Sequence, residues 1–193
     1  THILYRMKLR LTILSALFSC LYCFTAKAQQ PVTWEPYFCT DNDSLTVYYY
    51  ANQGNGALNN VSPIYAHTGV ITNLSVSPSD WKHVKSSWGV NDPATQLTSL
   101  GGNLFKIKFH VRNYYNVPVS ETILKVAYVF RNSTSTLVGR NVDGSDIFIP
   151  IYDAGLNVKI KQPDNLASNV LVVANGGAIS VTGLASQTCN LSL

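Results

Sequence analysis

The sequence is poor in the residues that build most catalytic and metal centres. Four histidines, four cysteines and ten acidic residues are spread over 193 positions. There is no Gly-x-Ser-x-Gly nucleophile elbow, no glycine-rich phosphate loop and no EF-hand pattern. Most carboxylates stand in turn contexts, where an aspartate caps its own backbone, and not as the pair that a glycosidase needs. We therefore expect no catalytic residue, no metal site and no cofactor in this chain.

Cysteine is scarce in the part of the chain that would form a secreted fold. Cys20 and Cys23 fall in the first thirty residues, and Cys39 and Cys189 stand at opposite ends of the remainder. Such a pair can bridge in an oxidising compartment, but the separation favours two unpaired thiols. Two cysteines without clustered histidines do not form a zinc site.

Charge is low and unevenly distributed. Only 12% of the residues are charged and 46% are hydrophobic, so the chain can bury a core and is not disordered by composition. The formal net charge of +4 comes from four basic residues in the first thirty positions, and the rest of the chain holds ten basic and ten acidic side chains. A neutral body predicts no nucleic-acid partner and no binding to an anionic membrane surface.

The N-terminal stretch has the layout of a secretory signal peptide over residues 7–28. A short basic segment comes first, an apolar run extends from Leu11 to Phe24, and Ala26-Lys27-Ala28 forms an A-x-A cleavage site. The apolar run is shorter than the about 18 residues of a membrane span. We expect cleavage after Ala28, a secreted or cell-surface location, no membrane span in the mature chain, and an upstream extension in residues 1–6.

From Pro31 onward, short β-type segments alternate with turns. The clearest segment, Leu104 to Val111, puts two lysines and His110 on one face and apolar residues on the other, as in a half-buried strand. It follows a hairpin signal at Gly101-Gly102-Asn103. Tyr114 to Pro118 is expected to form a loop or one helical turn. Further strands are expected at Trp34–Phe38, Ser44–Ala51, Ile64–Ala66, Val70–Ile71, Gln96–Leu100, Thr122–Arg131, Asp146–Tyr152 and Leu156–Lys161.

This pattern, without an amphipathic helix, predicts an all-β immunoglobulin-like β-sandwich over residues 29–162. A β-barrel is the alternative. A β pattern resumes at residues 169–174 and 178–183, around Asn175-Gly176-Gly177. A unit of about 30 residues does not fold alone without disulfide bridges, bound metal ions or oligomerisation. We therefore expect residues 163–193 to contain a linker and the truncated start of a second β-sandwich.

Aromatic residues are the strongest functional signal in the mature chain. An apolar pyranose face packs on an indole ring, and neighbouring polar side chains bond the hydroxyl groups. The alternative is that the tryptophans fill the sandwich core, as is common in such folds. Trp88 stands next to Gly89 in a turn-rich context, so it is expected to be exposed. The candidate sugar-stacking residues are Trp81, Trp88, Tyr65, Tyr114 and Tyr115.

Several stretches of the chain resemble the N-terminal immunoglobulin-like domain of secreted α-amylase-family proteins (glycoside hydrolase family 13) of Bacteroidetes-type bacteria. The resemblance covers about 130 residues, nearly all of the mature first domain. It is carried by the text between Val61 and Asn91 and by GNLFKIKF (Gly102–Phe109), RNYYNVP (Arg112–Pro118), ETILKVAYVFRN (Glu121–Asn132) and DGSDIFIPIYDAGLNVKI (Asp143–Ile160).

The resemblance implies a modular enzyme, in which a signal peptide, an immunoglobulin-like domain and a second β-sandwich precede a catalytic (β/α)-barrel. The three acidic residues of that barrel are not in this chain. The expected role is an accessory region that binds starch or braces the barrel, with an α-glucan and the catalytic domain as partners. The alternatives are a non-enzymatic surface glycan-binding protein of a starch-utilisation system and a structural immunoglobulin-like module.

Overall fold

The computed structural model describes residues 30–162, 175–178 and 180–190. The expected extension in residues 1–6, the signal peptide in residues 7–28 and the β pattern in residues 169–174 lie outside the described residues. Within the described residues, no helix has the length and apolar character needed to cross a membrane.

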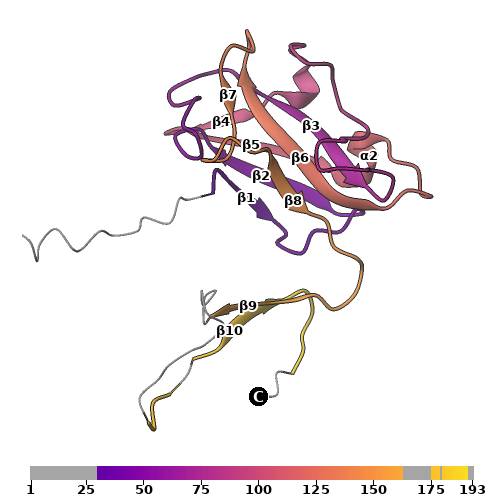
Figure 1. Ribbon diagram of the computed structural model, residues 1–193, viewed down its shortest axis with the longest axis vertical. Coiled ribbons are helices and arrows are strands. Elements are labelled where there is room, and N and C mark those ends of the chain that lie inside the picture. The colour runs from indigo at the N-terminus through magenta and orange to yellow at the C-terminus, as the bar shows by residue number, and fades with distance from the viewer. Residues whose placement is uncertain (1–29, 163–174, 179, 191–193) are drawn as a thin grey trace, which may run out of the picture.

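Two antiparallel sheets form a β-sandwich, so the predicted all-β fold class is confirmed (Figure 1). One sheet has the order β1-β2-β5-β4, and in the other β6 pairs with β3 on one side and with both β7 and β8 on the other. These strand orders match the A-B-E-D and C-F-G sheets of an immunoglobulin constant-type domain, with β7 and β8 together in the place of strand G. The strands are β1 (Val32–Glu35), β2 (Ser44–Tyr50), β3 (Ile64–Thr72), β4 (Thr98–Gly101), β5 (Leu104–His110), β6 (Ile123–Asn132), β7 (Val138–Gly139) and β8 (Ile147–Pro150).

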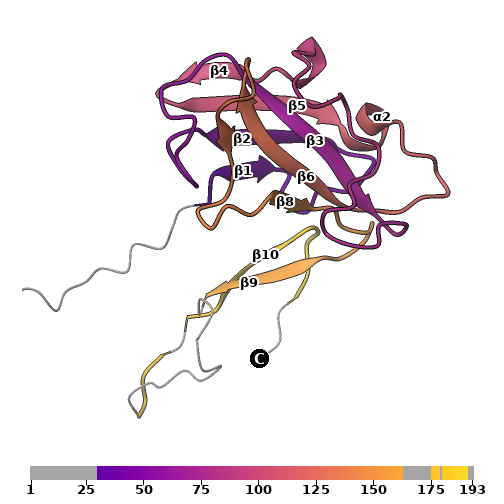
Figure 2. The same cartoon turned by 45° about the horizontal axis from the view of Figure 1, so that its top comes forward.

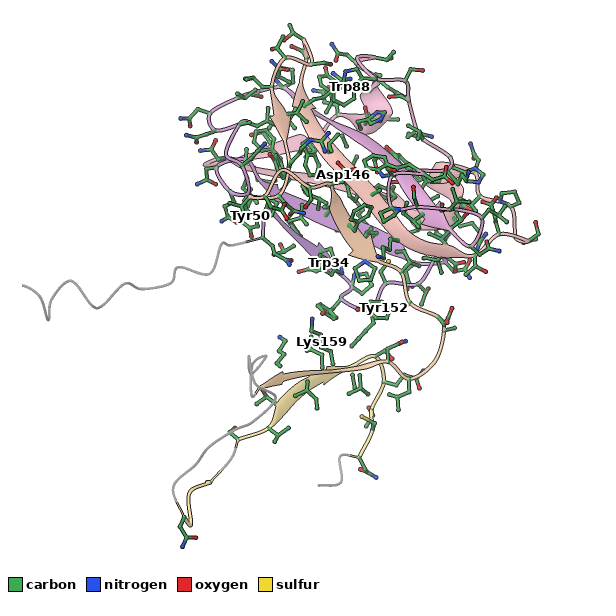
Figure 3. All side chains as sticks on the ribbon, viewed as in Figure 1. Trp34, Tyr50, Trp88, Asp146, Tyr152 and Lys159 are labelled. Atoms are coloured by element: carbon green, nitrogen blue, oxygen red, sulfur yellow. The ribbon has the colours of Figure 1, made fainter. Side chains whose placement is uncertain are left out.

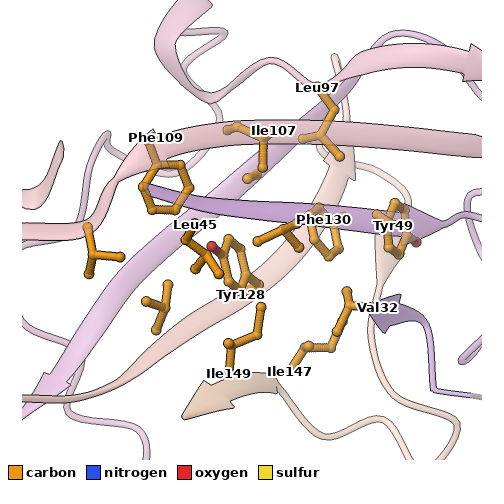
Figure 4. Close-up of a cluster of buried hydrophobic side chains, with 14 of the residues drawn as sticks. Val32, Leu45, Tyr49, Leu97, Ile107, Phe109, Tyr128, Phe130, Ile147 and Ile149 are labelled. Carbon is orange, nitrogen blue, oxygen red and sulfur yellow. The ribbon is translucent and has the colours of Figure 1, made fainter. Parts of the chain in front are cut away.

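The core lies between the two sheets and follows the alternation of the strands (Figures 2 and 4). In β2 every second residue is buried, as expected where one face of an antiparallel sheet packs on a core. Tyr49 from β2 stacks on Phe130 from β6, with ring centroids 3.9 Å apart. A Cβ at position 139 would clash with the Tyr49 hydroxyl group, so Gly139 permits the close approach of β7 to this core.

Several predicted elements are confirmed with changes in their bounds, but the two strands expected at Ile64–Ala66 and Val70–Ile71 are wrong, because one strand, β3, runs through both. The alternation predicted over Leu104–Val111 forms β5, which ends one residue earlier at His110, and the glycine pair before it joins β4 to β5. The strand expected at Trp34–Phe38 is wrong in its bounds, because β1 ends at Glu35, before Pro36, which has no N–H for a ladder. The strand expected at Gln96–Leu100 begins two residues later, at Thr98, after the short helix η1 (Pro93–Thr95). One helical turn, α2 (Val111–Tyr115), follows β5.

The segment Leu156–Lys161 was expected to be the last strand of the first sandwich, and the structure corrects this. Strand β9 (Val158–Gln162) pairs with β10 (Thr182–Ala185) in a separate two-stranded sheet. Figure 1 shows this hairpin below the sandwich. The alternating pattern correctly indicates a strand, but alternation of apolar and polar residues does not determine which strand is its partner.

Candidate functional site

The segment between β3 and η1, which carries Trp81 and Trp88, folds back along the edge of β3 and reaches over its outer face at Gly69. Its backbone pairs with Val70 through Lys82, with N···O distances of 2.9 and 2.7 Å, and Lys85 N donates to Thr68 O at 2.9 Å. A Cβ on Gly69 would lie 2.9 Å from the Lys82 oxygen. Glycine at position 69 therefore lets this segment, residues 73–92, lie directly on the sheet.

Side chains from β6 and its neighbours hold the same segment. Arg131, which is 1% exposed, donates to Asn91 Oδ1 at 2.8 Å and to the Val90 oxygen. Its guanidinium carbon lies 5.1 Å from the centroid of the Tyr65 ring. His83 Nε2 lies 2.6 Å from Glu121 Oε2. The position of both tryptophans thus depends on contacts between residues that are far apart in the sequence.

A groove of about 340 Å³ opens where this segment meets the outer face of β3 and β6. The His67 ring forms its centre. It lies nearly parallel to Trp81, with centroids 5.8 Å apart, and edge to face with Trp88, with centroids 5.1 Å apart. We call it the Trp88 groove, and it is lined by His67, Ser79, Trp81, Trp88, Val129, Arg140 and Asp146.

The polar groups of the Trp88 groove are held in place by the protein. Trp81 Nε1 donates to the Pro78 oxygen at 3.2 Å, which fixes the orientation of the indole. Arg140 forms an ion pair with Asp146. Because these two charges compensate each other, the groove offers hydrogen-bond donors and acceptors with little net charge. Trp88 is 48% exposed, as its sequence context predicted, and Figure 3 shows it above Asp146 in that view.

The His67 imidazole is neutral at neutral pH. Burial lowers its pKa below the usual 6.5, and the positive charge of Arg131 lowers it further, while Asp146 and a backbone hydrogen bond at Ser86 act in the opposite direction. A neutral imidazole provides one N–H donor and one nitrogen acceptor. Since the ring N–H is engaged by the Ser86 backbone, the other ring nitrogen of His67 is an acceptor in the groove.

The lowered pKa of His67 predicts that acid destabilises the fold through this residue. Below about pH 6.5 the unfolded chain binds a proton at His67 before the folded chain does, so the free energy of unfolding falls as the pH decreases through this region. The variant His67→Gln is expected to lose less stability between pH 7 and pH 5 than the wild type. Urea denaturation at a series of pH values measures the difference, and parallel pH profiles of the two proteins would contradict it.

Of the five candidate stacking residues, the structure brings Trp81 and Trp88 together and places the three tyrosines elsewhere. Tyr65 is 8% exposed and lies under Arg131. Tyr115 is 3% exposed, and its hydroxyl group shares a 2.6 Å hydrogen bond with Thr68. These two rings offer no free face to a ligand.

Tyr114 is half-buried, but its ring already has partners. It stacks on Phe109 with centroids 4.2 Å apart, and Lys85 Nζ lies 4.6 Å from its centroid. Its hydroxyl group donates to the Ala94 oxygen at 2.7 Å. Tyr114 therefore braces the segment that carries the tryptophans and is not part of the Trp88 groove.

Five residues of the groove were not among the sequence candidates, namely His67, Ser79, Val129, Arg140 and Asp146. His67 stands in the middle of a strand, where only the pairing of β3 with β6 shows that it faces outward beside Val129. Asp146 follows a polar loop and is the first residue of the strand expected at Asp146–Tyr152, a pattern that does not mark a binding residue. No local signal places these residues near the tryptophans, because the contacts arise from the fold.

The described residues contain no group of three histidine, cysteine or acidic side chains that could hold a metal ion. Cys39 and Cys189 are free thiols. Burial, with the nearby Asp43 and Asp41, raises the pKa of the Cys39 thiol to about 12, so it stays protonated and is not a nucleophile. The Trp88 groove has ring faces and hydrogen-bonding groups, which suit the binding of a ligand with both apolar and polar surface.

A family model described as a domain of unknown function (DUF8578) matches residues 32–138. The match runs from β1 to the first residue of β7, and so it includes His67, Trp81 and Trp88 but ends before Arg140 and Asp146. No curated protein is significantly similar to the chain.

Proposed function

The chain belongs to the family described as a domain of unknown function, DUF8578, and for this member we propose an accessory role in the breakdown of α-glucans. In this proposal the chain is the N-terminal region of a secreted α-glucan-degrading glycoside hydrolase, and its β-sandwich binds the glucan without catalysis. The observation that carries the proposal is the Trp88 groove, in which two tryptophans, a neutral imidazole and a compensated ion pair converge.

The chemistry of the Trp88 groove suits a sugar ring. Indole rings provide broad apolar surface with little conformational entropy to lose, and the half-exposed Trp88 is available to the C–H face of a pyranose. His67, Arg140 and Asp146 supply both donors and acceptors for hydroxyl groups. A groove of about 340 Å³ is at the lower end of ordinary ligand sites. The α-glucan identity of the sugar rests on the resemblance to amylase-family domains.

The charge of the groove predicts a preference for neutral over acidic sugars. A uronic acid carboxylate would compete with Asp146 for Arg140 and leave one negative charge without its partner. We expect maltoheptaose to bind at least about tenfold more tightly than oligogalacturonate of the same length, about 1.4 kcal/mol. Isothermal titration calorimetry with both ligands measures this ratio. Equal affinities, or tighter binding of the acidic chain, would overturn the assignment of neutral glycans.

Two further roles are compatible with some of the same observations. A non-enzymatic surface glycan-binding protein would use the same groove, and the coding sequence downstream of Leu193 distinguishes it from an enzyme. A role in bracing a neighbouring domain is favoured by a different observation: on β9, Val158 and Ile160 are 55% and 57% exposed. Apolar side chains that remain uncovered on a short hairpin are typical of a surface that packs against another unit.

A further inference from the structure

Strand β8 connects the Trp88 groove with a second aromatic groove. Ile147 and Ile149 of β8 are buried in the core, while Phe148 and Pro150 point outward. Asp146, two residues before Phe148, has the same orientation and lines the Trp88 groove. Residues two positions apart on a strand lie on one face about 7 Å from each other. Asp146 and Phe148 therefore form a continuous outward row.

The second groove lies where β1 and β8 approach each other at the edge of the sandwich. It has a volume of about 540 Å³, and we call it the Trp34 groove. Its aromatic residues come from segments that are far apart in the sequence. They include Trp34, Tyr37, Phe148 and Tyr152. Lys159 from β9 also lines the groove.

The rings of the Trp34 groove hold one another in a fixed arrangement. Trp34 and Tyr37 have centroids 5.7 Å apart and nearly parallel planes, and Trp34 Nε1 donates to the Tyr37 oxygen at 3.1 Å. Tyr152 lies 6.5 Å from Tyr37, and Lys159 Nζ lies 5.4 Å from the Tyr37 centroid. The groove is thus a second preformed site with apolar ring surface, and Lys159 stands at its rim above Tyr37.

We propose that the two grooves form one binding track, in which a glucan chain extends from Trp81 and Trp88 past Asp146 and Phe148 to Trp34 and Tyr152. The inference rests on the proposed function and adds the length of the ligand to it. Figure 3 shows the order along one view of the molecule, with Trp88 above Asp146, Trp34 below it, and Tyr152 and Lys159 beyond. The preferred ligand is therefore a long α-glucan chain and not a mono- or disaccharide.

A track of two linked sites makes affinity depend on chain length. A short chain occupies one groove, whereas a chain that spans both gains the second set of contacts without a second loss of translational freedom. We expect the dissociation constant to fall at least about tenfold from maltotriose to maltoheptaose.

The three tryptophans of the chain allow a direct test with the wild-type protein. The indole N–H signals of Trp34, Trp81 and Trp88 are followed by nuclear magnetic resonance during titration with maltotriose and then with maltoheptaose. Maltotriose is expected to shift the Trp81 and Trp88 signals first, and maltoheptaose is expected to shift all three. Shifts of Trp81 and Trp88 with a Trp34 signal that maltoheptaose leaves unchanged would overturn the track alone. No shift with either sugar would overturn the proposed function as well.

Variants provide the second arm of the test. Trp34→Ala is expected to reduce maltoheptaose affinity to that for maltotriose and to leave maltotriose binding unchanged. Tyr50→Ala removes an aromatic ring from the outer face of the other sheet, where Tyr50 pairs with Leu104, and should change neither affinity. Because Trp34 also packs against the core, Phe148→Ala is the alternative variant if Trp34→Ala does not fold. An unchanged length dependence in a folded variant would contradict the track.

Discussion

Replacing Trp88 by alanine is expected to weaken the binding of maltoheptaose about 30-fold or more, which corresponds to about 2 kcal/mol. Trp88 and Trp81 flank the His67 ring, and truncation of either indole removes apolar surface that the remaining side chains cannot replace. Since about half of the Trp88 side chain is buried, its loss should also lower the free energy of unfolding, by about 1–2 kcal/mol. Calorimetric titration gives the affinity, and circular dichroism with urea denaturation confirms the fold.

A matched control separates this effect from a general loss of aromatic surface. Tyr50→Ala removes a half-buried ring on the outer face of the β1-β2-β5-β4 sheet, where Tyr50 pairs with Leu104. This variant should bind maltoheptaose as the wild type does. If Trp88→Ala and Trp81→Ala both bind with wild-type affinity while folded, the Trp88 groove is not the sugar site.

Replacing Arg131 by methionine is expected to lower the free energy of unfolding by about 2–3 kcal/mol and to weaken glucan binding at the same time. Arg131 is 1% exposed and joins β6 to the segment that carries the tryptophans, through Asn91 and the Val90 oxygen. Methionine fills a similar length but donates no hydrogen bond, so these acceptors lose their partner. Without this anchor, the residues before η1 no longer hold Trp88 against His67.

The control for this prediction is Lys108→Met, which removes a cation from the exposed outer face of β5. Its free energy of unfolding should remain within about 0.5 kcal/mol of the wild type. Urea denaturation of both variants and calorimetry with maltoheptaose measure the two effects. Arg131→Met with wild-type stability and wild-type affinity would show that the segment holds its position without the guanidinium.

The fold was largely predictable because the local sequence patterns indicate strands and turns that the sandwich contains. The alternation of β5 and the glycine pair before it are short-range signals, and they required no knowledge of the partner strands. The pairing of β9 was not predictable in this way. The alternation of apolar and polar residues in β9 is compatible with any neighbouring strand. Only the structure shows that β9 pairs with β10 and not with a strand of the sandwich.

The candidate site was predictable only in part. The turn-rich sequence around Trp88 indicated exposure, and the structure confirms it. The tyrosines were less predictable, since an aromatic residue suits a core and a binding platform equally well, and Tyr115 lies in the core. His67 and Asp146 come together because β3 and β8 both pair with β6, and the tryptophans join them through the backbone pairing of Lys82 with Val70, which no local pattern encodes.

The most direct test of the account is electrophoresis of the wild-type protein in native gels with and without amylose. Amylose is expected to retard the wild-type protein relative to a reference protein that does not bind it. A double variant, Trp81→Ala with Trp88→Ala, should migrate equally in both gels. A wild-type protein whose mobility is the same with and without amylose would contradict the central claim that the Trp88 groove binds an α-glucan.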